Sequence, residues 1–222
     1  MNEVTKIDGI GSSVRRTEDK KFLTGKGKYT DDINRPGQVQ AYFLRSDVAH
    51  AKIKKIDTKN AQSAPGGVGV FTGDDIAADK VGGPICGWVV PCRDGSATKE
   101  PPHPLLAQGT VRFVGDAIAV VLAETAEQAK SGAELIDVDY EELSPVVDFE
   151  NAGDGAQIHD EVPNNCYFDW ELGDEKATAD ALSGAKKIVK LRVRNNRLVP
   201  NAMEPRCALA EFDNLDDSYT LH

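Results

Sequence analysis

The residues most able to do chemistry in this 222-residue chain are its cysteines and histidines, four of each. The cysteines are Cys86, Cys92, Cys166 and Cys207, and the histidines are His50, His103, His159 and His222. Cys86 and Cys92 stand too far apart for the close cysteine pair of a zinc site, and no second pair lies nearby. No two histidines flank a glutamate at the i, i+4 spacing of a helical zinc motif. We therefore interpret the cysteines as unbridged thiols and the histidines as surface or hydrogen-bonded side chains.

Neither the glycines nor the acidic pairs of the chain complete a catalytic motif. Gly67-Val68-Gly69 begins like a dinucleotide-binding loop, but Thr72 occupies the place of the third glycine, so we predict a turn at the entry of a strand. The acidic pairs fall at expected strand ends or helix starts, where carboxylates cap N–H groups and face water. These pairs are Asp31-Asp32, Asp74-Asp75 and Glu141-Glu142. Residue types and spacing alone thus assign no catalytic, cofactor-binding or metal-ligating residue.

The composition excludes several classes of protein. A net charge of -10 argues against a nucleic-acid partner, because phosphate binding needs a cationic face. Hydrophobic residues make up 40% of the chain and charged residues 28%, which is typical of a globular protein rather than a disordered one. No apolar run reaches the roughly 18–20 residues of a membrane span. Residues 1–11 lack the apolar core of a secretory signal. We expect reduced thiols and a cytoplasmic location.

Five strands are expected between residues 39 and 140. Apolar residues alternate with polar ones or run continuously over 39–43, 51–56, 68–71, 117–123 and 136–140. The run 117–123 is apolar throughout, which predicts a central strand covered on both faces. Met1 to Leu23 is mostly polar, and we interpret residues 1–23 as an extended arm that needs another surface to order it.

Two helices should lie between these strands. Asp57-Thr58 can cap a short helix that ends at Pro65-Gly66-Gly67. Thr125 with Gln128 matches a capping box, and the small side chains that follow, Ala126, Ala129 and Ala133, give the second helix a face that can lie close to a sheet.

The remaining segments carry weaker patterns. Residues 80–109 form a long stretch rich in glycine and proline, and a loop of this length often has a function of its own, such as contacting a partner. Residues 150–165 look like a polar connection between domains. Beyond them we predict a helix over 174–182, a long strand over 188–199, a strand over 207–212, and an alternating end at Tyr219 and Leu221. Residues 151–222 hold too little apolar surface for a core of their own, so we interpret them as the opening of a larger, truncated domain.

Several blocks, in order along the chain, resemble the large subunit of the xanthine dehydrogenase, aldehyde oxidase and carbon monoxide dehydrogenase family. TGKGKYTDDI (24–33), AHAKIKKID (49–57), PGGV (65–68), TGDDI (72–76), VGDAIAVV (114–121) and VDYEELSPVV (138–147) are similar to its a/b hammerhead domain. NNRLVPNAMEPR (195–206) is similar to the start of its molybdopterin-binding region. The amino-acid sequences of these blocks are most similar to those of large subunits of carbon monoxide dehydrogenase type.

This resemblance implies an α+β fold with three parts. Residues 1–23 would be an N-terminal arm, and residues 24–146 an a/b hammerhead domain with a mixed sheet and short helices. Residues 147–222 would be the first strands of an incomplete molybdopterin-binding domain.

The resemblance also implies a parent oxidoreductase that uses water as oxygen donor and molybdenum held by molybdopterin cytosine dinucleotide. Its partners would be the remainder of the large subunit, an FAD-binding medium subunit and a 2Fe-2S small subunit. The family's catalytic and cofactor-binding segments lie downstream of this sequence, so we expect no catalytic activity, no bound cofactor and no bound metal in this chain alone. Glu204 and Arg206 match the family pattern, but we interpret them as a buried ion pair or a turn contact rather than as cofactor support.

Three further interpretations stay open at this point. The chain could be a non-catalytic interaction module that docks on the rest of a split subunit or on redox partner subunits. It could, with less support, be a free-standing ligand-binding domain. An unfinished strand edge after Lys187 also predicts self-association. The sequence does not name the substrate.

Overall fold

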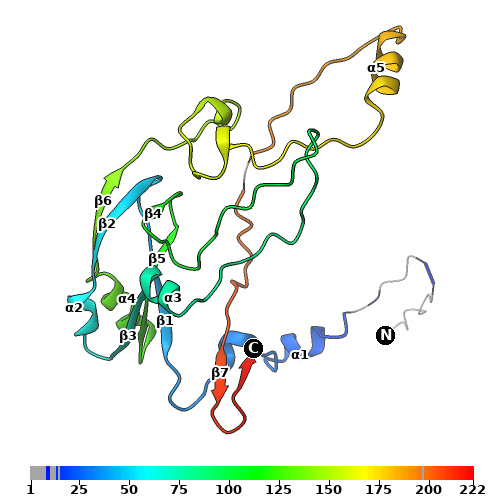
Figure 1. The fold of residues 1–222 in the computed structure, drawn as a ribbon. Coiled ribbons are helices and arrows are strands. Elements are labelled where there is room, and N and C mark those ends of the chain that lie inside the picture. Colours follow the sequence, from blue (N-terminus) through cyan, green and yellow to red (C-terminus); the bar gives the residue numbers. More distant parts are fainter. Residues whose placement is uncertain (1–8, 11–13, 15, 197) are drawn as a thin grey trace. The chain divides into compact units, whose positions relative to one another are not determined.

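The structure, a computed structural model, describes residues 9–10, 14, 16–196 and 198–222. It divides into two compact units, Gly37–Arg192 and a second unit that joins Met1–Pro36 to Val193–His222. Each unit is described by itself, and Figure 1 labels the elements along the chain. No helix in the described part of the chain has the length and apolar character to cross a membrane.

Gly37–Arg192 contains most of the regular structure. Its strands are β1 (Gln40–Arg45), β2 (Ala51–Asp57), β3 (Gly67–Thr72), β4 (Thr110–Val111), β5 (Ala117–Ala123) and β6 (Asp137–Glu142). Its helices are α2 (Lys59–Gln62), α3 (Gly73–Ala78), α4 (Ala126–Ala133) and α5 (Glu175–Ser183), with 3-10 turns at Ala152–Asp154 and Pro163–Asn165. The five predicted strands are all confirmed, with ends shifted by a few residues at most.

The six strands form two three-stranded sheets. Their orders are β1-β5-β3 and β4-β2-β6. The prediction specified a mixed sheet, whereas the strand pairs of these two sheets run antiparallel. For example, Val120 of β5 pairs with Phe43 of β1 on one side and with Phe71 of β3 on the other. Short helices packed on strands confirm the α+β class.

β5 is the central strand of its sheet, as its continuous apolar run predicts. Neighbouring residues along it face opposite ways, because side chains alternate across a strand. Ala119 and Val121 join one buried cluster with Ala133, whereas Ile118 joins a second cluster with Val111. Both faces of the strand are therefore covered.

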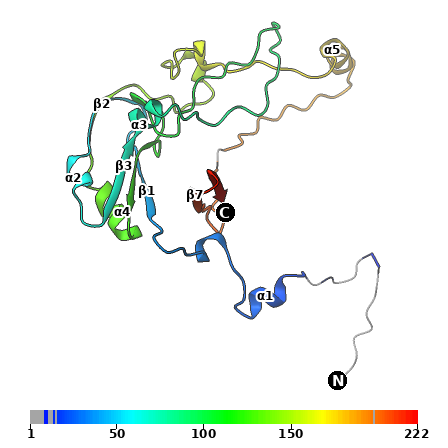
Figure 2. The ribbon, with the colours of Figure 1, turned by 60° about the horizontal axis from the view of Figure 1, so that its bottom comes forward.

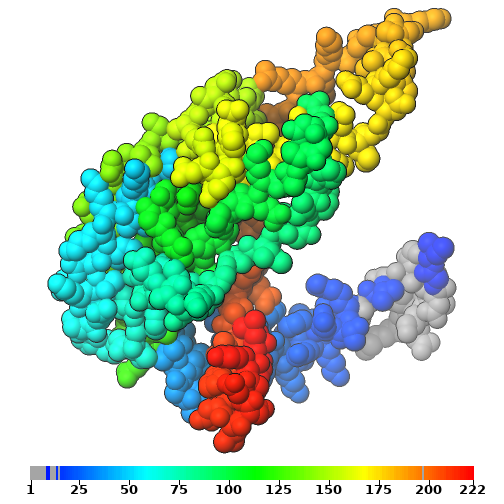
Figure 3. Space-filling model, in the orientation of Figure 1, coloured from blue at the N-terminus to red at the C-terminus, as the bar shows by residue number. Residues whose placement is uncertain are grey.

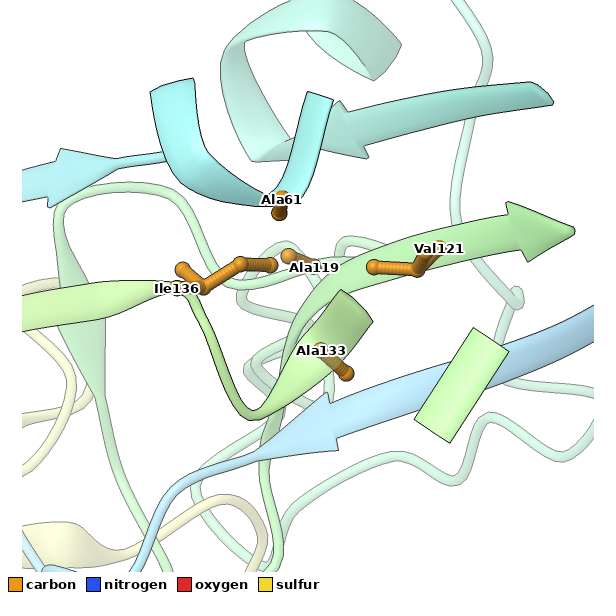
Figure 4. Packing of buried hydrophobic residues seen from close by; sticks show 5 residues of the cluster. All are labelled: Ala61, Ala119, Val121, Ala133 and Ile136. Atoms are coloured by element: carbon orange, nitrogen blue, oxygen red, sulfur yellow. The ribbon is translucent and has the colours of Figure 1, made fainter. Parts of the chain in front are cut away.

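Helix α4 packs closely on this sheet because the residues facing it are small. Ala129, Gly132 and Ala133 are buried, and a Cβ added at Gly132 would lie 3.1 Å from Val121 Cγ1. Figure 4 shows Ala133 of this helix among the buried residues of the first cluster, with Ala61 of α2 opposite. Figures 1 and 2 both show α2 and α4 beside β3. The backbone N–H of Gln128 donates to Thr125 Oγ1 at 3.2 Å, which confirms the cap. The return bond of the predicted capping box does not form, because Gln128 Oε1 is buried with no partner among the described residues.

Helix α3 begins with a second cap. The Asp75 carboxylate accepts hydrogen bonds from the backbone N–H and the hydroxyl of Thr72, at 2.7 and 2.8 Å. These bonds hold the pKa of Asp75 below its ordinary value of 3.8. At the 3-10 turn Thr30–Asp32, the Asp32 carboxylate accepts from the Tyr29 N–H at 2.9 Å. The prediction that these acidic pairs cap N–H groups is confirmed for Asp32 and Asp75.

The predicted strand over 188–199 is wrong. Its described residues, 188–196 and 198–199, form no strand, and Arg197 lies outside the described residues. A strand needs a hydrogen-bonded neighbour, and no other described segment pairs with this one. The predicted helix over 174–182 is confirmed as α5, although none of its residues is buried.

The second unit contains helix α1 (Asp19–Leu23) and the hairpin β7 (Ala210–Asp213) and β8 (Ser218–Leu221). The rings of Phe212 and Tyr219 pack across the hairpin, 4.8 Å between centroids. Glu211 accepts from Arg35 Nε at 2.9 Å and lies 2.8 Å from His222 Nε2. The predicted extended arm was wrong over its last five residues, which form α1. Residues 1–8, 11–13 and 15 of that arm lie outside the described residues.

Candidate functional site

The long loop, residues 80–109, lies against a later segment of its own unit. The backbone N–H of Arg93 donates to the Asp169 carbonyl at 2.7 Å, and that of Lys99 to the Tyr167 carbonyl at 2.9 Å. The Arg93 guanidinium also pairs with the Asp169 carboxylate at 2.6 Å and reaches Glu171 at 3.7 Å. Figure 3 shows the green atoms of the loop beside the yellow atoms of this segment.

A glycine allows two parts of the loop, around Gly83 and His103, to approach each other closely. A Cβ added at Gly83 would overlap the backbone carbonyl of His103, whereas one added at Gly82 would meet nothing within 4 Å. The loop contains an isolated antiparallel bridge between Pro91 and Ala97, and its remaining residues contribute no helix. Its shape therefore depends on these close contacts and on the segment it touches.

A cavity of about 870 Å³ opens between the loop and this segment. Aromatic side chains from both sides form its walls, with Trp88 edge-on to Trp170 at 6.1 Å and His159 edge-on to Tyr167 at 6.0 Å. Lys99 and Glu100 are the lining residues with full charges, and their signs are opposite. A second cavity, of about 540 Å³, is lined by Cys92, Cys166 and ionic side chains.

Burial sets the protonation of two polar groups in the larger cavity. It lowers the pKa of His159, and the nearby Arg112 cation lowers it further. It raises the pKa of the Tyr167 hydroxyl. At neutral pH His159 is therefore a neutral ring and Tyr167 a protonated phenol. Neither side chain has a hydrogen-bond partner in the described part of the chain, so both are available to a ligand.

Two of the other histidines, His50 and His222, make hydrogen bonds of the kind found in structural histidines. His50 is buried, with Nδ1 2.9 Å from the Ser144 carbonyl, and His222 contacts Glu211. The interpretation as hydrogen-bonded residues is confirmed for these two, and His103 is exposed. His159 is half-buried and lines the cavity, as the exposed His103 also does. Nothing in the sequence joins His159 to Trp88, which stands 71 positions earlier, so its role was missed.

The described residues contain no group of three or more His, Cys, Asp or Glu side chains placed to hold a metal ion. The four cysteines are free. Glu204 and Arg206 are both exposed, with a bend at Met203 and Glu204, so the interpretation as a buried ion pair is wrong.

Two family models match the chain. The model described as "Aldehyde oxidase and xanthine dehydrogenase, a/b hammerhead domain" matches residues 24–144. The model described as "Molybdopterin cofactor-binding domain" matches residues 158–222. The larger cavity combines loop residues from the first match with His159, Tyr167 and Trp170 from the second.

Curated relatives and solved structures agree with these models. The chain is 34% identical over 215 residues to the nicotine 6-hydroxylase large subunit of Paenarthrobacter nicotinovorans, covering 96% of this chain and 25% of the relative. It is 30% identical to the carbon monoxide dehydrogenase large chain of Afipia carboxidovorans, covering 97% and 27%. The crystal structure of quinoline 2-oxidoreductase from Pseudomonas putida 86 matches with a TM-score of 0.75 and 32% identity, covering 94% and 26%. The chain thus spans about a quarter of the length of the relatives it matches.

Proposed function

The chain belongs to the aldehyde oxidase and xanthine dehydrogenase family, and from that premise we propose that it is a structural part of a molybdenum-dependent oxidoreductase large subunit. The observation that carries the proposal is a contrast in burial. The strands of the hammerhead match pack around buried clusters, whereas none of the described residues from 163 to 222 is buried. Such a segment gains stability only when further polypeptide covers it. Residues 1–23, 24–146 and 147–222 then act as arm, scaffold and opening of the cofactor-binding domain.

The activity we propose belongs to the whole subunit and not to this chain. The whole enzyme would oxidise a small carbonyl compound, CO or a nitrogen heterocycle, with water as oxygen donor and molybdopterin cytosine dinucleotide as cofactor. Similarity to molybdenum enzymes, the Cu,Mo-CO dehydrogenase among them, supports this class of chemistry. We assign catalysis to the rest of the subunit because the chain spans about a quarter of the length of the relatives it matches.

The proposed partners follow from the same relatives. Their names include "large chain", "large subunit" and "dehydrogenase complex subunit gamma", which describe members of multi-subunit enzymes. We propose that the remainder of a large subunit covers the exposed segment, and that an FAD-binding medium subunit and a 2Fe-2S small subunit complete the complex. We place the complex in the cytoplasm.

Cofactor loading tests the assignment directly. The purified 222-residue chain is incubated with isolated molybdenum cofactor, passed through a desalting column and assayed for bound molybdenum and for dye reduction with CO, aldehydes and quinoline. We expect background metal and no turnover, whereas a full-length large subunit from the same family, treated identically, retains the metal. Stoichiometric molybdenum with turnover in the short chain would contradict the proposal.

An interaction module is the second candidate, favoured by the apolar residues that the loop leaves in water, such as Ile85 at 90% exposure. The two candidates differ in the gene. Continuation of the reading frame past His222 into a glycine-rich segment supports the subunit, and a stop codon supports the module.

Self-association is a further part of the proposal. β7 and β8 pair with each other, and no other described strand pairs with either, so each has an outer edge with free N–H and C=O groups. We expect dimers or larger species through residues after Lys187. Light scattering that finds a strict monomer at high concentration would contradict this.

A further inference from the structure

The outer edge of strand β1 pairs with no other strand in the described part of the chain. In the sheet order β1-β5-β3, β1 bonds to β5 on one side only, and Figure 2 shows it at the margin of the sheet. The strand belongs to the packed hammerhead match and not to the exposed segment from residue 163 onward. An edge strand presents backbone N–H and C=O groups that can bind a further strand.

The backbone groups at this edge can be assigned residue by residue. Alternate residues of a middle strand bond to opposite neighbours. The Glu124 N–H donates at 3.0 Å to the carbonyl of the residue just before β3, so Val121 bonds toward β1, where Tyr42 is its partner. Tyr42 therefore bonds inward, and Ala41 and Phe43 direct their N–H and C=O groups away from the sheet.

The other outer strands of the two sheets are protected against strand addition, whereas β1 is not. β3 has a register shift between Gly67 and Gly69, β4 has two residues, and β6 alternates acidic side chains with others. Irregular, very short and charged edges are the devices by which proteins prevent further pairing. β1 pairs regularly over Gln40–Leu44 and carries one charged side chain, Arg45.

A groove of about 460 Å³ accompanies this edge. It is lined by Ala41–Arg45 together with Ala133 and Glu134 at the C-terminal end of α4. Tyr42 and Phe43 are 38% and 45% exposed, and neighbouring residues of a strand point to opposite faces. An added strand would therefore place one row of side chains against Phe43 and the other against Tyr42 and Glu134.

Charge selects the row on the α4 face. Glu134 stands at the C-terminal end of α4, where a helix carries partial negative charge. Its contact with Lys130 is 3.9 Å between exposed side chains, which is a weak ion pair. Arg45 lies over the Phe43 ring, on the other face. A lysine or arginine facing Tyr42 and Glu134 would thus meet an aromatic ring and a carboxylate.

We propose that β1 binds an extended segment of another polypeptide, added along its outer edge as a fourth strand, with β-branched side chains on the Phe43 face and lysine or arginine on the α4 face. The main-chain groups of Ala41 and Phe43 supply affinity, and the two rows of side chains supply selectivity. The net charge of -10 favours a basic segment over a second copy of this chain at this edge. The proposal does not depend on the proposed function.

Hydrogen exchange of the 222-residue chain, followed by NMR, tests the edge one amide at a time. The probe is a blocked peptide of alternating valine and lysine. We expect saturable protection of the Ala41 and Phe43 amides and a much smaller change at Tyr42, whose amide already bonds to β5. Ala41 and Phe43 amides that stay unprotected up to the solubility limit of the peptide overturn the proposal. Equal protection by a peptide of alternating valine and glutamate overturns it as well.

Two variants separate strand addition from general adhesion. Ala41→Pro removes an outward N–H that β5 does not use, so the sheet should persist while the peptide binds about tenfold more weakly. Glu134→Gln should weaken the peptide about twofold to fivefold, and Glu127→Gln, the same charge change at a residue that does not line the groove, should leave it unchanged.

Three results at this stage contradict the proposal. Undiminished binding to Ala41→Pro excludes addition at this edge, and equal binding to Glu134→Gln and Glu127→Gln excludes the assigned charge contact. Ala41 and Phe43 amides that become protected in the free chain as its concentration rises would assign the edge to a second copy.

Discussion

Residues 37–144 and residues 163–222 differ in the burial of their apolar side chains. In the first region, the strands find partners: Val121 and Ala133 are buried between sheet and helix, and Ile118 is buried in the second cluster with Val111. In the second, a similar alternating run around Leu191 remains in water. The pattern of residues is alike, so the difference lies in whether a facing layer exists. A strand-like sequence becomes a strand only where another segment supplies hydrogen bonds and cover.

The largest expected effect comes from emptying the packed region. Ile118→Ala removes a fully buried side chain from the second cluster and should lower the free energy of unfolding by about 2–5 kcal/mol. Leu191→Ala, at a residue 83% exposed, should change it by no more than about 0.5 kcal/mol. Urea unfolding followed by far-UV circular dichroism measures both. Equal losses would mean that the second region is packed as tightly as the first.

The next effect concerns the loop of residues 80–109, which belongs to the first region and contacts residues 167–171 of the second. Gly83→Ala places a methyl group on the His103 carbonyl and should cost about 1–3 kcal/mol through local displacement of backbone. Gly82→Ala has open space and serves as the control. The indole NMR peaks of the two tryptophans that line the larger cavity should move in Gly83→Ala and stay in place in Gly82→Ala. Unmoved peaks in Gly83→Ala would contradict the loop geometry.

Two helix caps sharpen the comparison further. Thr125→Ala removes the cap of α4, a helix packed on β5, and should lower overall stability by about 1 kcal/mol. Asp174→Ala removes the cap of α5, in which the Ala177 N–H donates to Asp174 Oδ1 at 2.8 Å. No residue of this helix is buried. The substitution should fray α5 and leave the urea midpoint of the sheets unchanged. A midpoint that falls equally in both variants would show that α5 is part of the packed core.

The smallest effect is a pH dependence at α3. Because hydrogen bonds from Thr72 hold the pKa of Asp75 below 3.8, the carboxylate stabilises the folded state fully above that pH. This contribution is lost as the pH falls through the lowered pKa. An NMR titration of the Asp75 carboxyl carbon should give a midpoint below 3.8, and the Thr72 amide signal should change with the same midpoint. A midpoint at or above 3.8 would contradict the cap.

The sequence predicted the packed region better than the exposed one for a physical reason. Ala117 to Ala123 encodes both its own strand and its burial, and Thr125 with Gln128 encodes a cap within a few residues. The cavity could not be predicted in this way, because Trp88 and His159 come to line it through contacts between distant segments that no local pattern describes. The strand expected over 188–199 failed because its partner is not among the described residues. Local signals therefore predict elements, whereas sites depend on contacts between distant segments.

Hydrogen exchange measured residue by residue tests the central contrast most directly. In the isolated chain, the backbone amides of Ala119 and Val121 in β5 should exchange slowly, and those of residues 184–196 should exchange at the earliest time point. Adding the remaining polypeptide of a large subunit should slow the second group and leave the first unchanged. Strong protection of residues 184–196 in the isolated chain would contradict the account, because that segment would then be folded without a partner.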